Sequence, residues 1–313
     1  MRIPRISGQR LLSSLLPIGL TAAALGGVAC GGPNNAPTGP APKVSTSTSV
    51  AASATKAAAG ANIPTVNVSA REYAFDAPDS IPAGLTHIHM QNVGKEDHQA
   101  QLLKLKSGVT MAQFQAALQK GPDAALPFVT AEGGPNAEKA GASADSLQNL
   151  QPGQYVFICF VPAPDGKPHL AKGMIKPLQV TAGSPAPAAE LPAAQNTVTA
   201  REFLFDGPTT LPAGQATINF KNAGTQSHEM SLVKLNAGVT PDQLKAALAS
   251  TAPPSGPPPF SSEGGMGGIN PGETGQTTVN LTPGTYALIC NIPDPTSGKP
   301  HVALGMISSF TVR

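Results

Sequence analysis

The sequence is poor in aromatic and charged residues. Its 313 residues include no tryptophan, aromatic residues make up 4%, charged residues 12%, and the formal net charge is +2. A nucleic-acid-binding surface needs clustered basic residues or aromatic rings that stack on bases. We therefore expect no nucleic-acid partner. Beyond the N-terminus, the sequence also lacks an uncharged apolar run long enough to cross a bilayer.

The N-terminus has the pattern of an export signal. Arg2, Arg5 and Arg10 precede a largely apolar, uncharged stretch at 11–29, which ends in small residues before Cys30. This resembles the lipobox of bacterial lipoproteins, although Gly27 stands where that motif usually has a branched aliphatic residue. The resemblance implies that residues 1–30 are a signal peptide and that lipid on Cys30 anchors the chain to a membrane outside the cytoplasm, on a periplasmic or outer face. An ordinary cleaved signal and an uncleaved anchor are the alternatives.

The rest of the sequence is a duplication. Residues 63–182 align with residues 196–313. The matched pairs include SAREYAFD with TAREFLFD, SIPAG with TLPAG, and LKSGVT with LNAGVT. Two long copies indicate tandem domains, because a solenoid uses shorter and more numerous units. Residues 31–62 are rich in Ala, Thr, Ser, Pro and Gly and predict a flexible spacer, and residues 183–195 predict a Pro/Ala linker.

Within each copy, apolar residues mostly alternate with polar ones. Val66, Val68 and Ala70 show this period of two, and turn signals such as Pro-Ala-Gly separate the runs. Many short strands of this kind favour an all-β fold of two antiparallel sandwiches. Thr-x-x-Gln at 110–113 and at 240–243 predicts one short inserted helix in each copy, begun by a capping box. The stretches after these helices, including both Glu-Gly-Gly triplets, are expected to form loops.

Each copy also holds a cysteine, a histidine and a methionine in one short segment. The segments are CFVPAPDGKPHLAKGM at 159–174 and CNIPDPTSGKPHVALGM at 290–306. Thiolate, imidazole and thioether donors together suit copper. His98 and His228 stand at matching positions from which a fourth ligand could come. If Cys30 carries lipid, each copy keeps one thiol, which either binds metal or joins a Cys159–Cys290 disulfide.

These residues resemble the cupredoxins, a family of blue copper proteins. Asn precedes the first His in both copies, and Pro-Gly-x-Tyr-x-x-x-Cys ends at each Cys. The resemblance implies a Greek-key β-sandwich with one type 1-like copper site per domain. Its ligands would be His98, Cys159, His169 and Met174 in the first domain, and His228, Cys290, His301 and Met306 in the second, with each Met axial. The loop between Cys and the second His is longer than in most small cupredoxins, and a comparable loop occurs in copper nitrite reductases.

The resemblance implies an electron-transfer protein with a redox partner protein that the sequence does not name. Two-domain enzymes of the family place a His beside the type 1 Cys, whereas Ile158, Phe160, Ile289 and Asn291 flank the cysteines here. We therefore expect no enzyme and no small-molecule substrate. The alternatives are copper storage or delivery, and a metal-free cupredoxin-like interaction module on the cell surface.

Each of these candidate ligand residues, taken alone, could have a purely structural role. His98 and His228 would be surface histidines, each Cys a plain core residue, and each Gly-Met simple packing. Their joint recurrence in the same order favours the copper site. His87 and His89 form a His-x-His pattern on a predicted strand, but the second copy has Thr217 and Asn219 there. We expect this pair to be exposed and without a role.

Overall fold

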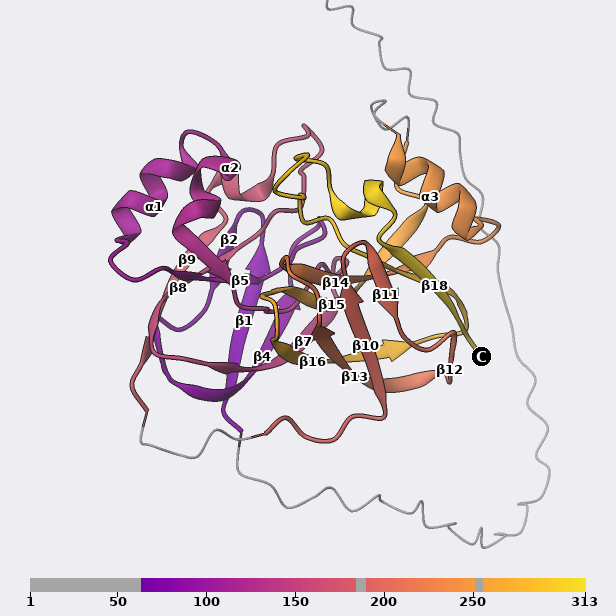
Figure 1. Ribbon diagram of the computed structural model, residues 1–313, viewed down its shortest axis with the longest axis horizontal. Coiled ribbons are helices and arrows are strands. Elements are labelled where there is room, and N and C mark those ends of the chain that lie inside the picture. Colours follow the sequence, from indigo (N-terminus) through magenta and orange to yellow (C-terminus); the bar gives the residue numbers. More distant parts are fainter. Residues whose placement is uncertain (1–62, 184–189, 251–255) are drawn as a thin grey trace, which may run out of the picture. The chain divides into compact units, whose positions relative to one another are not determined.

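The two copies fold into three β-sheets (Figure 1). The computed structural model describes residues 63–183, 190–250 and 256–313. The predicted signal peptide with Cys30, the spacer 31–62 and part of the linker 183–195 lie outside the described residues.

The largest sheet has eight strands and contains strands of both copies. Their order is β2 (Ala74–Asp76), β1 (Thr65–Arg71), β4 (Gly84–Asn92), β7 (Ser143–Leu150), β16 (Thr274–Leu281), β13 (Gly214–Asn222), β10 (Asn196–Arg201) and β11 (Leu204–Asp206). At the junction, β7 pairs antiparallel with β16, where Ser146 lies opposite Thr277. Thr277 Oγ1 also donates to the Asp145 carbonyl at 2.6 Å. The two copies are therefore joined through a continuous sheet.

Each copy adds a five-stranded sheet of its own. In the first copy the order is β3 (Ser80–Pro82), β9 (Ile175–Thr181), β8 (Gly153–Ile158), β5 (Gln101–Leu105) and β6 (Val129–Ala131). In the second it is β12 (Thr210–Leu211), β18 (Ile307–Val312), β17 (Gly284–Ile289), β14 (His228–Leu235) and β15 (Phe260–Ile269). The all-β fold predicted from the sequence is confirmed.

Apolar side chains of facing sheets form the cores. Val68 and Ile88 from the large sheet share one buried cluster with Leu102 and Phe157 from the smaller sheet. The second copy has a corresponding cluster built from its own residues. The alternation seen in the sequence is real, because β1 buries Val66, Val68 and Ala70 and exposes Thr65 and Asn67. Burial of such side chains, at roughly 25 cal/mol per Å² of apolar surface, stabilises each sandwich.

The pairing is not wholly antiparallel. Strand β1 runs parallel to β4 and β10 runs parallel to β13, as do β3 with β9 and β12 with β18. Between β1 and β4 the chain passes through β3, which belongs to the other sheet. A tight turn joins only antiparallel strands, so the parallel pair β1 and β4 needs a crossover connection of this kind. The expectation of antiparallel sandwiches is therefore corrected for these four parallel strand pairs. The Greek-key connectivity stays a prediction.

Both predicted helices are present. Helices α1 (Met111–Leu118) and α3 (Pro241–Ala249) begin with complete capping boxes at Thr110 and Thr240. They bury Phe114 and Leu244 against the outer side of the smaller sheets. The first copy also has α2 (Pro122–Ala125) and a 3-10 turn, η1 (Leu126–Phe128), which the expectation of one helix per copy did not include.

One predicted loop is a strand. Strand β15 runs from Phe260 to Ile269 through the second Glu-Gly-Gly triplet. Gly265 has φ +107°, and a Cβ there would lie 2.0 Å from the Met230 carbonyl oxygen. Glycine is required because the two backbones approach so closely at this irregular pairing. The same glycines remove the apolar alternation by which a strand is recognised in a sequence.

Candidate metal centres

The loop after β8 returns His169 to Cys159 by its own backbone hydrogen bonds. His169 N–H donates to the Val161 carbonyl at 2.9 Å, and Leu170 N–H donates to the Cys159 carbonyl at 2.9 Å. Pro168 caps the short 3-10 turn η2 (His169–Lys172) that follows. Proline restricts the backbone before folding, which favours one loop conformation.

The second copy repeats this arrangement after β17. His301 N–H donates to the Ile292 carbonyl at 2.9 Å, and Val302 N–H donates to the Cys290 carbonyl at 2.7 Å. The turn η3 (His301–Leu304) matches η2. The extra residue of this loop is therefore accommodated without moving the histidine away from the cysteine.

The methionine of each loop lies next to the same residues. Met174 N–H donates to the His169 carbonyl at 3.1 Å, and Cys159 N–H donates to the Met174 carbonyl at 3.3 Å. Gly173 precedes it with φ +103°, a conformation that favours glycine. The Met174 side chain is fully buried in the same apolar cluster as Cys159. Gly305 and Met306 repeat these features, with hydrogen bonds of 2.9 and 3.4 Å.

A buried asparagine shapes the loop that carries the first histidine. Asn92 Nδ2 donates to the carbonyls of Glu96 and Glu138 at 2.8 Å each, and its Oδ1 accepts from Gly94 N–H at 2.9 Å. His98 N–H donates to the same Glu138 carbonyl at 3.1 Å. Asn222 makes the corresponding bonds in the second copy. This explains why Asn stands shortly before His in both copies.

The three strong donors of each copy converge. His98 Nδ1 lies 3.0 Å from His169 Nδ1, which lies 3.4 Å from Cys159 Sγ. In the second copy, the corresponding distances among His228, His301 and Cys290 are 3.1 and 3.4 Å. All three donor atoms of each set lie within 4.8 Å of one another, and all six residues are 0% exposed. The histidines are therefore not surface residues.

This geometry fits a bound metal ion. Donors that each lie about 2 Å from one ion are separated by roughly 3 to 4 Å. His169 Nε2 lies 2.9 Å from Glu96 Oε2, so its proton belongs on Nε2 and the Nδ1 lone pair faces His98 and Cys159. Two imidazoles with a thiolate and a thioether form the donor set that copper prefers. The structure brings the strong donors together as the sequence led us to expect; their role as ligands stays a proposal.

Burial favours the neutral form of His98, His228 and His301 and the protonated form of both cysteines when no ion is bound. Burial lowers the pKa of His98 and of His228, and burial together with the charge of His228 lowers the pKa of His301 to about 4. Burial raises the pKa of the Cys159 thiol to about 12 and raises that of Cys290 as well. Metal binding must therefore displace the thiol proton, and its affinity rises with pH.

The outer nitrogens of the histidines contact residues that sequence reasoning missed. Glu96 faces His169, whereas Gln226 Oε1 faces His301 Nε2 at 2.9 Å. Glu72 Oε1 lies 3.5 Å from His98 Nε2, and Glu202 lies in the same place beside His228 at 3.6 Å. The sequence could have pointed to Glu72 and Glu202, because both copies have a glutamate at this place in the aligned Ala-Arg-Glu segment.

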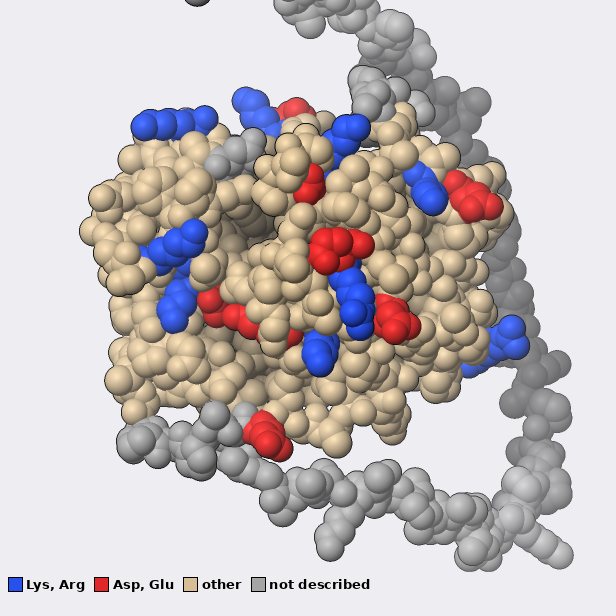
Figure 2. Space-filling model, in the orientation of Figure 1, with Lys and Arg blue, Asp and Glu red and all other residues tan. Residues whose placement is uncertain are grey.

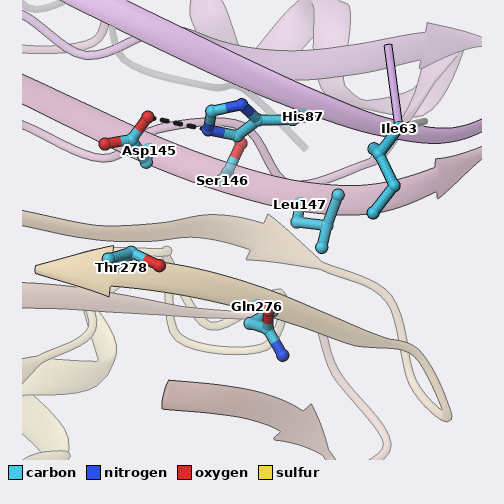
Figure 3. A pocket seen from close by; sticks show the side chains of 7 residues that line it. All are labelled: Ile63, His87, Asp145, Ser146, Leu147, Gln276 and Thr278. Carbon is cyan, nitrogen blue, oxygen red and sulfur yellow. Dashed lines mark hydrogen bonds and ion pairs between the residues drawn. The ribbon is translucent and has the colours of Figure 1, made fainter. Parts of the chain in front are cut away.

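His87 and His89 lie apart from both centres. On the face of the large sheet away from the cores, His87 Nε2 and His89 Nδ1 each lie 2.8 Å from one oxygen of Asp145. Figure 3 shows His87 and Asp145 among the residues that line a pocket, together with Gln276 and Thr278 of the second copy. This pocket has a volume of about 190 Å³. The pair is half-buried rather than exposed as expected.

The disulfide alternative is wrong. Cys159 and Cys290 are both free and buried, each beside the histidines of its own copy. Each thiol is thus available to its own donor set.

No protein-family model matches the chain, and no curated protein matches it. Solved structures similar to it include reduced auracyanin from the photosynthetic bacterium Roseiflexus castenholzii, at 24% identity over 39% of this chain and 99% of that one, with a TM-score of 0.27. Auracyanin A, a blue copper protein from Chloroflexus aurantiacus, matches at 26% identity over 37% and 99%, with a TM-score of 0.23. Blue copper oxidase from Nitrosomonas europaea matches at 14% identity over 80% and 86%, with a TM-score of 0.24. At such TM-scores these similarities carry no weight for the site, and the case for copper comes from the donor geometry.

Proposed function

We propose that the chain binds two copper ions, one in each copy, and transfers electrons. The ligands would be His98, Cys159, His169 and Met174 in the first copy, and His228, Cys290, His301 and Met306 in the second. The observation that carries the proposal is the convergence of buried His, Cys and His donors at equivalent places in both copies. Bound there, copper would supply a one-electron couple, and the chain would supply a fixed, dry donor set.

Electron transfer fits the burial better than catalysis on a bound substrate. All six strong donors are fully buried, so a substrate molecule has no direct access to them in this conformation. An electron can reach a buried centre without such access. The chain has six histidines, and four of them are the proposed copper ligands. The other two, His87 and His89, both contact Asp145. This supports the expectation that the protein is not an enzyme.

Addition of Cu(II) to the purified chain tests the proposal. We expect two copper ions per chain and a strong thiolate-to-copper absorption band in the red part of the visible spectrum. Reduction by a one-electron donor should bleach the band, and oxidation should restore it. Copper binding without reversible bleaching would favour storage or delivery. No copper binding would contradict the proposal and favour the metal-free interaction module.

We also propose that lipid on Cys30 holds the chain at a membrane outside the cytoplasm, where a redox partner protein would meet it. No helix in the described part of the chain is long and apolar enough to cross a membrane. On the face shown in Figure 2, acidic and basic side chains are interspersed over a largely uncharged surface, which suits a brief encounter with a partner. Stable attachment takes two or more acyl chains. Absence of palmitate label, or unchanged membrane association of Cys30→Ala, would contradict the anchor.

A further inference from the structure

The two centres share their donors but differ in the group behind the loop histidine. His169 Nε2 faces a carboxylate oxygen of Glu96, and His301 Nε2 faces an amide oxygen of Gln226, both at 2.9 Å. Either acceptor places the imidazole proton on Nε2 and leaves Nδ1 free for the metal. The two acceptors are alike in position and in their hydrogen bond with the histidine, and they differ in charge.

The orientation of the Gln226 amide is supported by its other contact. Gln226 Nε2 donates to Asp294 Oδ1 at 3.0 Å, so its carbonyl oxygen is the atom that faces His301. The charge of Asp294 therefore lies one side chain further from the histidine than the charge of Glu96 lies from His169. Coulomb energy falls with distance, so the nearer carboxylate has the larger effect.

The surrounding rings reinforce the difference. Tyr73 packs edge-on against His169 with centroids 5.0 Å apart, and its hydroxyl donates to Glu96 Oε1 at 3.1 Å. Phe203 occupies this place beside His301, at 5.2 Å, and has no hydroxyl. In the first copy, the Tyr73 hydroxyl thus holds the Glu96 carboxylate in place. The second copy has the apolar ring of Phe203 and the neutral amide of Gln226 instead.

Other charged groups near the centres do not account for this difference at the loop histidine. Glu72 and Glu202 lie at nearly equal distances from His98 and His228, so they act alike in both copies. Lys172 stacks over Tyr73 and pairs with Asp165, which offsets its charge. On the cysteine side of the second centre, Glu229 accepts hydrogen bonds from Asn291 and Asn136. The first copy has the neutral Gln99 at this position, so Glu229 contributes to a comparison of the two centres. It remains unchanged in the swap described below, so each variant differs from its own parent only in the group behind the loop histidine.

We propose that Glu96 lowers the reduction potential of the first copper centre, and that the neutral Gln226 has no such effect on the second. The inference rests on the proposed copper binding. Reduction adds one electron to Cu(II) and gives Cu(I), with no bond broken in the protein. A nearby negative charge and a more basic imidazole both stabilise Cu(II) more than Cu(I).

An exchange of the two residues tests the inference, one centre at a time. Cys290→Ser leaves only the first centre able to form a thiolate complex, and Cys159→Ser leaves only the second. In the Cys290→Ser chain, Glu96→Gln should raise the potential of the first centre. In the Cys159→Ser chain, Gln226→Glu should lower that of the second. Potentials are read by following the absorption band during titration with a one-electron mediator. Outer groups of this kind change metal affinity by about 10 to 100-fold, and a tenfold change in the ratio of Cu(II) to Cu(I) affinity is about 59 mV.

Gln179→Glu is the matched control, because it adds the same charge at an exposed position of β9 outside both donor sets. It should leave both potentials unchanged. Nitrogen NMR of the metal-free chain gives a second measurement, in which His169 should keep its proton on Nε2 in both wild type and Glu96→Gln. Copper centres with unshifted potentials after the exchange would overturn this inference alone. Absence of copper binding in the wild type would overturn it together with the proposed function.

Discussion

His98 and His169 face each other through their Nδ1 atoms at 3.0 Å, although 71 residues separate them in the chain. The same contact at 3.1 Å joins His228 and His301. With the proton of His169 on Nε2, its Nδ1 lone pair points to a centre shared with Cys159. Backbone hydrogen bonds hold this arrangement, so the protein has the donors in place before an ion arrives.

Removal of one thiol should empty one centre. Cys159→Ser is expected to halve the copper content and the intensity of the absorption band, because a hydroxyl is a poor ligand for copper. Cys290→Ser should do the same, and the double variant should lack the band. The buried Ser occupies nearly the same space, so circular dichroism should show an unchanged fold. His87→Ala is the control and should keep both ions, since it lies outside both donor sets. An unchanged band in either Cys variant would contradict the ligand assignment.

Gly94 should matter through His98. A Cβ at Gly94 would lie 2.6 Å from His98 Nε2 and 2.6 Å from Glu72 Oε1, closer than real contacts allow. Gly94→Ala should therefore displace His98 and weaken copper binding at the first centre by about tenfold or more, while the second stays unchanged. Gly256→Ala serves as control, because a Cβ there meets no atom within 4 Å. Competition with a copper chelator measures both affinities, and equal affinities in the two variants would show that His98 tolerates the contact.

Asn92 should stabilise the fold and the first centre together. Asn92→Ala removes the hydrogen bonds to the carbonyls of Glu96 and Glu138 and the one from Gly94 N–H. The Glu138 carbonyl keeps the bond from His98 N–H, whereas the Glu96 carbonyl and Gly94 N–H lose this partner. Buried groups left without partners cost about 1–3 kcal/mol. We expect a loss of that size in the free energy of unfolding, measured with urea, and weaker copper binding at the first centre. Gln91→Ala, which changes the half-buried neighbour on β4, should cost clearly less, because water can replace its bonds to the partly exposed segment 141–143. Similar losses in the two variants would contradict the role of Asn92.

The donor set was predictable because the duplication presents it twice. The segments at 159–174 and 290–306 keep the order Cys, His, Met, and His98 and His228 fall at matching positions. Chance rarely produces such a set twice. The residues that contact the outer nitrogens of the loop histidines could not be predicted in this way. Glu96 and Gln226 occupy the same structural place, but they differ in type, so an alignment of the copies gives no signal for them.

Parts of the fold depended on contacts that no local pattern encodes. Strands β7 and β16 pair through polar residues such as Ser146 and Thr277, which carry no apolar signal. Strand β15 contains glycines where backbones approach closely, so its sequence has the composition of a loop. The alternating strands and both capped helices were predicted, because their patterns involve residues that are close together in the sequence.

Glu138 should make stability depend on pH. Burial, with a smaller contribution from Glu263, raises the pKa of Glu138 to about 7, although Lys139 opposes the shift. The folded state therefore binds more protons than the unfolded state above the ordinary pKa of 4.5. Its contribution is fully present below pH 4.5 and is lost as pH rises through about 7. Relative to Glu138→Gln, the metal-free wild type should lose roughly 3 kcal/mol over this range. Urea unfolding at several pH values measures the difference, and a constant difference would contradict the shifted pKa.

Gln101 should hold the two copies together. Its buried side chain donates to the carbonyls of Gly133 in its own copy and Gly268 in the other, at 3.0 and 3.2 Å. Its Oε1 accepts from Gly268 N–H at 2.6 Å. Gln101→Ala would leave that N–H and the emptied space buried between the copies. An unsatisfied buried donor costs about 1–3 kcal/mol, and the lost packing adds to it.

We therefore expect Gln101→Ala to lower the urea midpoint of the metal-free chain clearly more than Gln179→Ala does. Gln179 also donates to two carbonyls, but it is exposed and both partners, Gly153 and Val180, belong to its own copy. Water can replace the lost bonds at Gln179, whereas it has poor access to Gly268. Intrinsic tyrosine fluorescence follows both copies, because Tyr155 and Tyr286 are buried in separate cores. Equal midpoints for the two variants would contradict this role of Gln101.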